Sequence, residues 1–351
     1  MNFQPELMRF QDGTEVKSPC DWEKRRKELV KILEENLYGA TPVKPASVTG
    51  AVTAAAPKCC SGHAVHETVE IAFDTPKGSF RFPLELITPT GVRPAPLFLL
   101  INFRRGAYDM YFPTEEIIDN GFALGVIYYE DITADNGDFG SGLAAMYDRE
   151  GHCAWGKIGM WAFAMSRAID YLETRPEIDK ERIAAIGHSR LGKTALWCAA
   201  QDERVKYVCS NDSGCCGASM ERTRHEGGET LARITSVFPF WFCENALMNV
   251  GHEQEMPFDQ HFLLAACAPR YVMVGSASLD NWADQYSEQL CCAAASPAWE
   301  LFGKKGYTGP ETPANVGDDF NEGDIAYHLR DGIHFLGRAD WQSYMEFVKK
   351  H

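Results

Sequence analysis

The spacing of hydrophobic positions predicts a helix near the start of the chain. Apolar residues recur on one helical face after Ser18, a good N-cap that is followed by a proline: Trp22, Leu29, Leu33 and Leu37. Gly39 then ends the segment. We therefore expect an amphipathic helix whose apolar stripe covers part of a larger core.

The pattern then changes from helical spacing to strand-like alternation. Residues 42–58 are rich in proline and alanine without a clear period, and we interpret them as a connector. Residues 63–73 and 80–88 are rich in β-branched and aromatic side chains, and the segment 74–79 between them contains proline and glycine. This arrangement predicts a β-hairpin.

Continuous apolar runs replace the alternation in the rest of the chain. Helical stretches such as 158–172 separate these runs, which cover 95–103, 122–129, 182–187, 205–210 and 270–276. Apolar strands joined by helices are typical of a mostly parallel sheet that is buried on both faces. We expect a three-layer α/β/α sandwich in one domain over residues 1–351, with residues 1–60 as an N-terminal helical extension and the hairpin following it.

The composition narrows the classes of function. The 351 residues are 45% hydrophobic and 24% charged, as in an ordinary soluble enzyme, and their formal net charge is −15. This acidic balance disfavours nucleic acids and anionic membranes as partners, and we expect no obligate protein partner. No apolar run reaches the ~18 residues of a membrane span. The start of the chain lacks the features of a secretory signal, so we expect a cytoplasmic protein, or a secreted or periplasmic one if a leader has been removed.

The cysteines raise the question of a metal site. There are 12 of them, but no two have the C-x-x-C spacing, and three groups are adjacent pairs: 59–60, 215–216 and 291–292. Adjacent cysteines chelate one tetrahedral ion poorly. We therefore expect reduced thiols that act as small buried apolar groups, with neither a metal nor an organic cofactor.

The segment 183–197, IAAIGHSRLGKTALW, fits two kinds of site. As G-x-x-x-x-G-K-T it matches a phosphate-binding P-loop, in which Lys193 would contact phosphates and Thr194 a magnesium ion. As G-x-S-x-x-G it places Ser189 on a sharp turn between a strand and a helix, where a hydrolase holds its nucleophile. Both interpretations require a strand before the turn and a helix after it, and the apolar pattern predicts both.

The order of polar residues at the predicted strand ends favours the hydrolase. Ser189, Asp212 and Asp280 each follow a predicted strand, and His334 lies near the C-terminus. Serine, acid, histidine is the chain order of an α/β-hydrolase triad, and a serine nucleophile needs an imidazole base that a carboxylate orients. The P-loop interpretation gives no role to Asp280 or His334. Arg190, directly after the serine, is a candidate to stabilise the oxyanion.

A family resemblance extends over most of the chain. GHSRLGK resembles the nucleophile motif G-x-S-R-x-G-K of the glucuronoyl esterases, carbohydrate esterase family 15, particularly their bacterial branch. Further segments that resemble this family follow in family order: 10–42, 156–173, 211–219, 228–234, 238–243, 257–270, 276–284 and 331–335. The resemblance implies the α/β-hydrolase fold and hydrolysis of a glucuronoyl or 4-O-methyl-glucuronoyl ester from glucuronoxylan, with lignin-type alcohols as leaving groups.

The resemblance also implies roles for single residues. It assigns the nucleophile to Ser189, the general base to His334 and the oxyanion contact to Arg190. It further implies that Lys193 contacts sugar hydroxyls and that Trp282 packs against the sugar ring.

The acid of the triad has two candidates within the family pattern. Some members use a Glu at the position of Asp212, and others use an Asp at the position of Asp280. Aspartate is one methylene shorter than glutamate, so we favour Asp280 and keep Asp212 as the alternative acid.

Two departures from the family pattern concern the site. His188 stands where the fungal enzymes carry a disulfide-forming cysteine, so that bridge cannot form here. Glu229 and Val237 stand where the fungal enzymes have a glutamine and a glutamate that help to bind the uronate. Esterase chemistry is unaffected, but the identity of the acyl group is left open.

Two further residues are candidates for the pocket lining because of their positions. Arg104 follows the run 95–103, where α/β-hydrolases often build a second oxyanion donor, and His225 lies in the polar loop after Asp212. The sequence thus predicts a serine carbohydrate esterase. An acetylxylan-type esterase on the same scaffold, a non-catalytic carbohydrate-binding protein and a P-loop nucleotide-binding protein are the alternatives.

Overall fold

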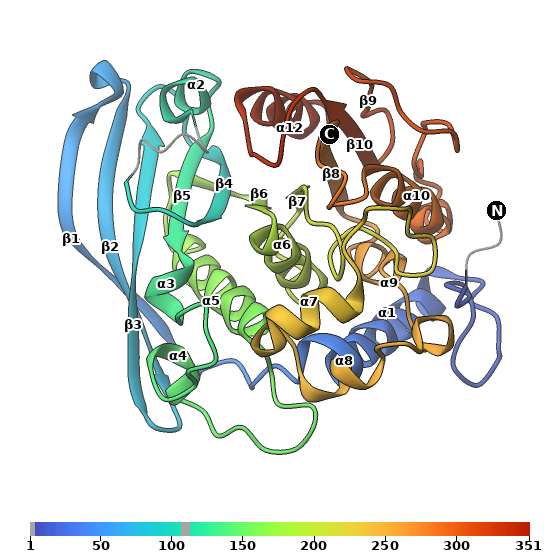
Figure 1. Cartoon of the computed structure of the whole chain (residues 1–351). Coiled ribbons are helices and arrows are strands. Elements are labelled where there is room, and N and C mark those ends of the chain that lie inside the picture. Colours follow the sequence, from blue (N-terminus) through green and yellow to red (C-terminus); the bar gives the residue numbers. More distant parts are fainter. Residues whose placement is uncertain (1–3, 107–112) are drawn as a thin grey trace.

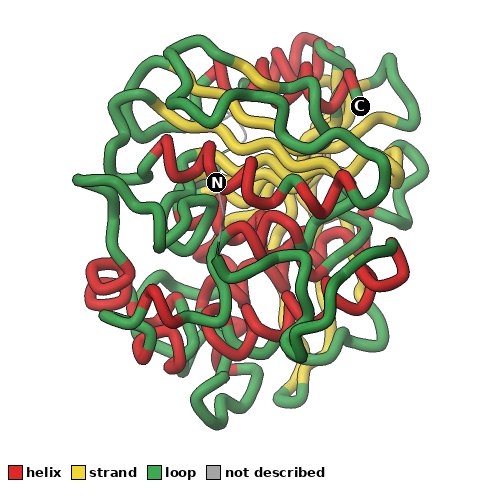
Figure 2. The backbone as a smooth tube through the Cα atoms, turned by 90° about the vertical axis from the view of Figure 1, so that its right-hand side faces the viewer, coloured by secondary structure: helices red, strands yellow, loops and turns green. Residues whose placement is uncertain are grey.

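Alternate residues of the central strands belong to two hydrophobic cores on opposite faces of the sheet. In β4 (Ala95–Asn102), Leu97 and Leu99 pack into one core, whereas Phe98 and Leu100 pack into the other. Because side chains alternate across a strand, a run that is apolar throughout must be covered on both faces. Helices accordingly lie on both sides of the strands (Figure 2). The predicted three-layer α/β/α arrangement is confirmed.

The structure is a computed structural model that describes residues 4–106 and 113–351, and its ten strands form one sheet (Figure 1). The order across the sheet is β1 (Val48–Cys59), β2 (Ala64–Thr75), β3 (Gly78–Pro89), β5 (Ala123–Tyr128), β4, β6 (Ile178–His188), β7 (Tyr207–Asn211), β8 (Tyr271–Ala277), β10 (Ile325–Arg330) and β9 (Asp319–Phe320). The six neighbouring strands from β5 to β10 in this order pair in parallel, and the strands at the two edges pair antiparallel.

The longer helices divide between the two cores. One core includes buried residues of α1 (Pro19–Leu33), α5 (Lys157–Leu172), α6 (Arg190–Gln201) and α10 (Gln285–Ala295). The other includes buried residues of α2 (Thr114–Asp119) and α12 (Arg338–Lys350). The remaining helical segments are short: η1 (Glu34–Tyr38, a π-helix), η2 (Cys60–Gly62), α3 (Tyr129–Ile132), α4 (Gly142–Ala145), α7 (Leu231–Val237), η3 (Pro239–Trp241), α8 (Glu244–Met248), η4 (Glu253–Glu255), α9 (His261–Ala265) and α11 (Pro297–Glu300).

The prediction that residues 42–58 form a connector is wrong, because most of this segment is the edge strand β1. Residues 51–58 of this strand are exposed, so burial imposes no alternation of apolar and polar side chains on them. Its partner β2 fixes its position through antiparallel pairing from Val48 to Cys59. The predicted hairpin is confirmed as β2 and β3, and it continues into the main sheet where β3 pairs with β5.

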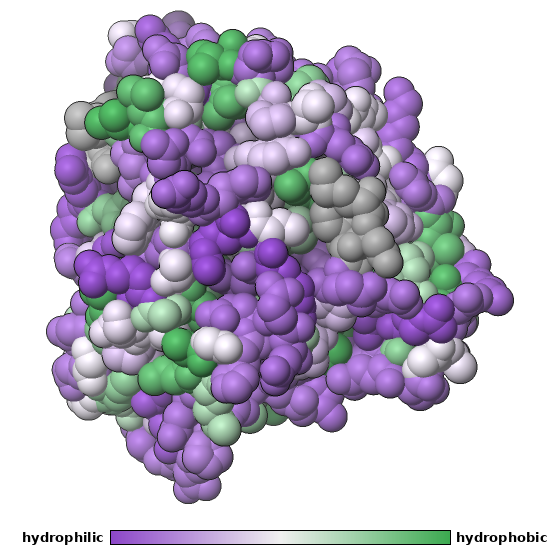
Figure 3. All heavy atoms as spheres, turned by 45° about the vertical axis from the view of Figure 1, so that its right-hand side comes forward, coloured by the Kyte–Doolittle hydropathy of each residue, from purple (hydrophilic) through white to green (hydrophobic). Residues whose placement is uncertain are grey.

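Nine of the cysteines are buried, and all 12 are free thiols, as predicted. Within the part of the chain that the structure describes, no helix is long and apolar enough to cross a membrane. The face of the molecule in Figure 3 is mostly hydrophilic, with hydrophobic residues in small separate groups. The candidate site lies at the carboxyl ends of the parallel strands, where open α/β sheets bind their ligands.

Candidate active site

Ser189 lies on a strained turn between β6 and α6. Its backbone φ is 57° and ψ is −131°, a conformation that residues other than glycine rarely adopt. The turn is tight: a Cβ atom on Gly187 would lie 2.0 Å from the carbonyl oxygen of Leu191, and one on Gly192 would lie 3.1 Å from Cβ of Ser213. The glycines of the G-x-S-x-x-G pattern are therefore required by close backbone approach, as expected of a nucleophile elbow.

His334 and Asp280 meet although they follow different strands, β10 and β8. Nδ1 of His334 lies 2.5 Å from Oδ2 of Asp280, a short hydrogen bond in which the imidazole donates to the carboxylate. The Asp280 side chain is 5% exposed, while that of His334 is 42% exposed. A buried carboxylate that holds one imidazole nitrogen leaves the other nitrogen free to accept a proton at the surface.

The imidazole of His334 also stands beside the elbow. The ring of His188, the residue before Ser189, lies 4.4 Å from the ring of His334 between centroids. Nδ1 of His188 lies 2.7 Å from Oδ1 of Asn211 at the end of β7. Burial, together with the nearby His334, lowers the pKa of His188 to about 3, so that this ring is neutral at physiological pH. A neutral ring therefore packs against the base.

Asp212 is close to this pair but has other partners. Oxygen and nitrogen ligand atoms of Asp212, Asp280 and His334 all lie within 4.8 Å of one another. Oδ1 of Asp212 accepts a hydrogen bond of 2.8 Å from the backbone N–H of Ala277, and Oδ2 lies 3.5 Å from Nη2 of Arg330. Burial, together with the nearby carboxylates, raises its pKa well above the ordinary value. The direct hydrogen bond to His334 comes from Asp280.

The guanidinium of Arg190, the first residue of α6, is held against aromatic rings. Nη2 forms an ion pair of 2.9 Å with Asp135, and the guanidinium lies 4.6, 5.0 and 5.6 Å from the ring centroids of Phe103, Tyr129 and Trp241. Within residues 4–106 and 113–351 its buried Nε has no hydrogen-bond partner. One donor of the residue that follows Ser189 is therefore not used by the described protein groups. The sequence alone did not indicate Asp135, since it lies in a loop far from any recognised motif.

Lys193 and Trp282, which the resemblance assigns to the sugar, both interact with Glu229, which stands at one of the uronate-binding positions. The indole of Trp282 hydrogen-bonds the carboxylate of Glu229, and the backbone N–H of Glu229 donates to the carbonyl of Trp282 at 2.9 Å. Burial raises the pKa of Glu229, while the charges of Lys193 and His334 act in the opposite direction. Trp282 is 50% exposed, so its ring is not packed in the core. The Nζ of Lys193 is buried and donates to the carbonyl of Ser213.

The other two predicted lining residues have different surroundings. Nδ1 of His225 lies 2.9 Å from the carboxylate of Asp284, and its ring packs against Tyr286. Arg104 is exposed at the end of the β4 strand, where its carbonyl accepts a hydrogen bond from Asn102. A role for either residue in substrate binding stays a prediction.

The P-loop interpretation does not fit the structure. The Lys193 ammonium, which would contact phosphates, is buried and bound to a backbone carbonyl. The hydroxyl of Thr194, which would bind magnesium, donates to the carbonyl of Arg190 at 3.0 Å within α6. Both side chains are therefore engaged inside the protein.

Among the residues that the structure describes, two clusters have the composition of metal sites. Asp212, Asp280 and His334 form one, and their contacts already assign them to the site above. The other is the buried cluster of Cys215, Cys216 and Glu221, in which Oε1 of Glu221 accepts from the Cys215 thiol at 3.0 Å and from the backbone N–H of Cys216 at 3.1 Å. These hydrogen bonds satisfy the buried Glu221 carboxylate, so we interpret the second cluster as structural.

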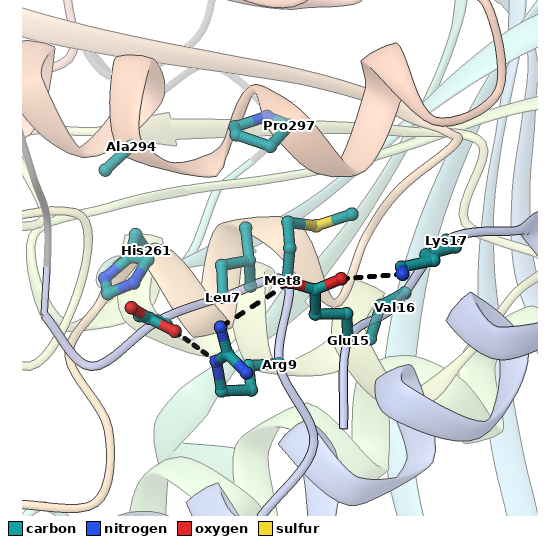
Figure 4. Close-up of a pocket in the computed structure, with 10 residues that line it drawn as sticks. Leu7, Met8, Arg9, Glu15, Val16, Lys17, His261, Ala294 and Pro297 are labelled. Atoms are coloured by element: carbon teal, nitrogen blue, oxygen red, sulfur yellow. Dashed lines mark hydrogen bonds and ion pairs between the residues drawn. The ribbon is translucent and has the colours of Figure 1, made fainter. Parts of the chain in front are cut away.

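A cavity of about 400 Å³ lies between the N-terminal segment and the α9 to α11 region (Figure 4). The charged side chains around it pair with one another: Arg9 with Glu6 at 2.5 Å, and Glu15 with Lys17 at 2.8 Å. His261 is buried in its wall and donates through Nε2 to the carbonyl of Pro5. No predicted site residue lines this cavity.

Comparisons with known proteins identify relatives along nearly the whole chain. Residues 71–303 match the family model described as glucuronyl esterase, fungi. A carbohydrate esterase from an unknown prokaryotic organism is 32% identical over 389 residues, which cover 99% of this chain and 89% of the relative. A 4-O-methyl-glucuronoyl methylesterase of Podospora anserina is 28% identical over 305 residues, covering 84% of this chain and 59% of the relative.

Solved structures agree with these sequence matches. A promiscuous CE15 esterase from a marine bacterial metagenome superposes with a TM-score of 0.90 at 32% identity, covering 100% of this chain and 97% of the other. A glucuronoyl esterase from Solibacter usitatus also gives a TM-score of 0.90 at 32% identity, covering 99% and 97%. The similarity of fold therefore extends over nearly the whole chain.

Proposed function

Since the chain belongs to the glucuronoyl esterase family, carbohydrate esterase family 15, with its α/β-hydrolase fold, we propose that Ser189, His334 and Asp280 perform the ester hydrolysis of this family. The protein is a carboxylic-ester hydrolase that acts on glucuronoyl esters. The observation that carries the proposed triad is the 2.5 Å hydrogen bond between His334 and Asp280, at the elbow that carries Ser189.

The reaction begins with attack on the ester carbonyl. The Ser189 hydroxyl attacks the carbonyl carbon while the free nitrogen of His334 takes its proton. Asp280 fixes the tautomer of His334 and stabilises the imidazolium that forms. The oxyanion develops at the N-terminus of α6, where the helix dipole and the guanidinium of Arg190, the next residue in the chain, supply positive charge to stabilise it.

The second half of the reaction releases the acid. His334 gives its proton to the leaving alcohol as the tetrahedral intermediate collapses to an acyl-enzyme on Ser189. Water then attacks the acyl carbonyl, with His334 again as the base. The uronic acid and the free serine are the products. The residues of this chain supply every proton transfer in this scheme.

The geometry around Trp282 supports a sugar as the acyl group. Its half-exposed ring offers an apolar face to the C–H side of a pyranose. The carboxylate of Glu229, which the Trp282 indole hydrogen-bonds, provides an acceptor for sugar hydroxyls, and the charge of the Lys193 ammonium offsets that of the carboxylate. We propose that the acyl group is glucuronoyl or 4-O-methyl-glucuronoyl from glucuronoxylan, esterified to a lignin-type alcohol.

A wider substrate range is a second candidate. The marine relative is described as a promiscuous esterase, and Val237 occupies one of the two positions that we align with the uronate-binding pair. Hydrolysis of other sugar esters, such as acetylated xylan, would follow from a less specific acyl pocket. Turnover of benzyl glucuronate and of 4-nitrophenyl acetate, measured as kcat/KM with Ser189→Ala as the blank, separates the two. A higher value for the glucuronate supports the first proposal, and a higher value for the acetate supports the second.

A further inference from the structure

The loop that carries His334 has little packing to hold it. It joins β10 to α12, contains no regular secondary structure, and leaves the His334 side chain 42% exposed. Besides the bond between His334 and Asp280, three hydrogen bonds tie the loop to the loop after β8: Leu279 N–H to the carbonyl of Gly332 at 2.9 Å, Gly332 N–H to Oγ of Ser278 at 3.3 Å, and Oγ of Ser278 to Oδ1 of Asp331 at 3.1 Å. These three involve Asp331 and Gly332, which come before His334, and none of them holds the backbone directly next to it. A general base must be held within a fraction of an ångström, so another group has to fix the residues on either side of it.

Arg330, the last residue of β10, supplies these contacts. Nη1 donates to the carbonyl of Asp331 at 3.0 Å, and Nη2 donates to the carbonyl of Ile333 at 3.1 Å and to that of Phe335. Ile333 and Phe335 are the neighbours of His334 in the chain. One guanidinium group therefore forms hydrogen bonds with the backbone on both sides of the general base.

The guanidinium is itself held by a buried carboxylate. Nε of Arg330 lies 2.6 Å from Oδ2 of Asp340, which is fully buried in the first turn of α12. The same carboxylate accepts from Nε2 of His328 at 2.9 Å and from the backbone N–H of Gly337 at 2.7 Å. Although burial acts to raise it, the pKa of Asp340 is lowered by His328 and Arg330, so this carboxylate is ionised. Asp340 thus joins the strand before the loop to the helix after it.

We propose that Arg330 is the positioning residue for the general base: its guanidinium, anchored on Asp340, holds the 331–335 loop so that His334 faces Ser189. The proposal rests on the function proposed above. It requires an arginine, because a planar group with five donors binds three carbonyls and a carboxylate at once, whereas a lysine ammonium has three donors at a single point. Nη2 also lies 3.5 Å from Asp212, so the same group offsets the second carboxylate near the base.

The variants Arg330→Lys and Arg330→Ala test this role, with Arg338→Ala as the control. Arg338 lies on the first turn of the same helix, is 73% exposed in its side chain and pairs with Glu116. Each variant is assayed for kcat and KM on benzyl glucuronate, for the rate at which a fluorophosphonate labels Ser189, and for thermal unfolding. Labelling depends on the Ser189–His334 pair and not on the sugar contacts.

We expect Arg330→Lys to lower kcat and the labelling rate together by about tenfold or more, with KM nearly unchanged and the fold intact. Arg330→Ala should regain activity with millimolar guanidinium but not with methylammonium, and Arg338→Ala should equal the wild type. A kcat and a labelling rate in Arg330→Lys that equal those of the wild type would overturn the inference. It would also be overturned if the activity lost in Arg330→Ala equalled the fraction of unfolded protein and guanidinium did not restore it. Wild-type protein that is neither labelled nor active would instead contradict the proposed function.

Discussion

Nδ1 of His334 lies 2.5 Å from Oδ2 of Asp280, although 54 residues separate the two in the chain. Parallel pairing of β8 with β10 places the loops after both strands at one edge of the sheet. The carboxylate is buried and the imidazole reaches the surface, which is the arrangement that a general base requires.

This contact predicts unequal effects of the two nearby aspartates. Asp280→Asn should lower kcat by about 10³–10⁴-fold, because the amide favours the wrong imidazole tautomer. Asp212→Asn should lower it by no more than about tenfold, since burial raises the pKa of Asp212 and the amide resembles its protonated form. Steady-state kinetics on benzyl glucuronate measures both. A loss in Asp212→Asn as large as that in Asp280→Asn would assign the acid to Asp212.

Arg190→Lys should lower kcat by about 10²–10³-fold and change KM little, because its partner is the oxyanion of the transition state. A lysine keeps the charge beside Asp135 but lacks the Nε donor next to Ser189. The measurement is kcat and KM on the same ester, with circular dichroism to check the fold. An increase in KM at constant kcat would instead place Arg190 in ground-state binding.

Trp282→Ala should raise KM for benzyl glucuronate by about tenfold, as expected for the loss of ~1.4 kcal/mol of ring contact. Its kcat/KM for 4-nitrophenyl acetate should stay unchanged, because an acetyl group does not reach the ring. Leu279→Ala is the matched control, since Leu279 is 65% exposed on the same loop. Equal losses on both esters would show that Trp282 supports the triad rather than the sugar.

His188 should make the protein less stable in acid. Burial lowers its pKa from 6.5 to about 3, so its contribution to stability is present above pH 6.5 and is lost as the pH falls toward 3. At pH 5 this loss is about 2 kcal/mol relative to pH 7. Urea unfolding at both pH values should therefore show a smaller difference in His188→Asn than in the wild type. His63→Asn, at an exposed histidine, should keep the wild-type difference, and an equal difference in His188→Asn would refute the shift.

Much of the fold could be predicted because burial leaves a clear pattern. The five apolar runs are the central strands β4 to β8, since strands covered on both faces are apolar throughout. The strand β1 was missed because its exposed alanine-rich sequence carries no such constraint. The strand β10 was also missed, and with it Arg330, since the polar residues His328 and Arg330 interrupt its apolar pattern and their partner Asp340 belongs to the next helix, α12.

The site was predictable only where residues follow strand ends or match a motif. Ser189, Asp280 and His334 all met one of these conditions, and the structure brings Asp280 and His334 into contact. Asp135 met neither condition. It is recognised only in three dimensions, where it pairs with Arg190 and accepts from the indole of Trp241 at 2.6 Å. Contacts that form between loops far apart in the chain leave no local pattern in the sequence.

The central claim is that Ser189 is the nucleophile of a glucuronoyl esterase, and Ser189→Ala tests it most directly. The measurement is the rate of benzyl alcohol release from benzyl glucuronate by wild type and variant at equal concentration, with matching circular dichroism spectra. The account predicts turnover by the wild type and a loss of at least about 10³-fold in Ser189→Ala. Wild-type turnover in Ser189→Ala would contradict it.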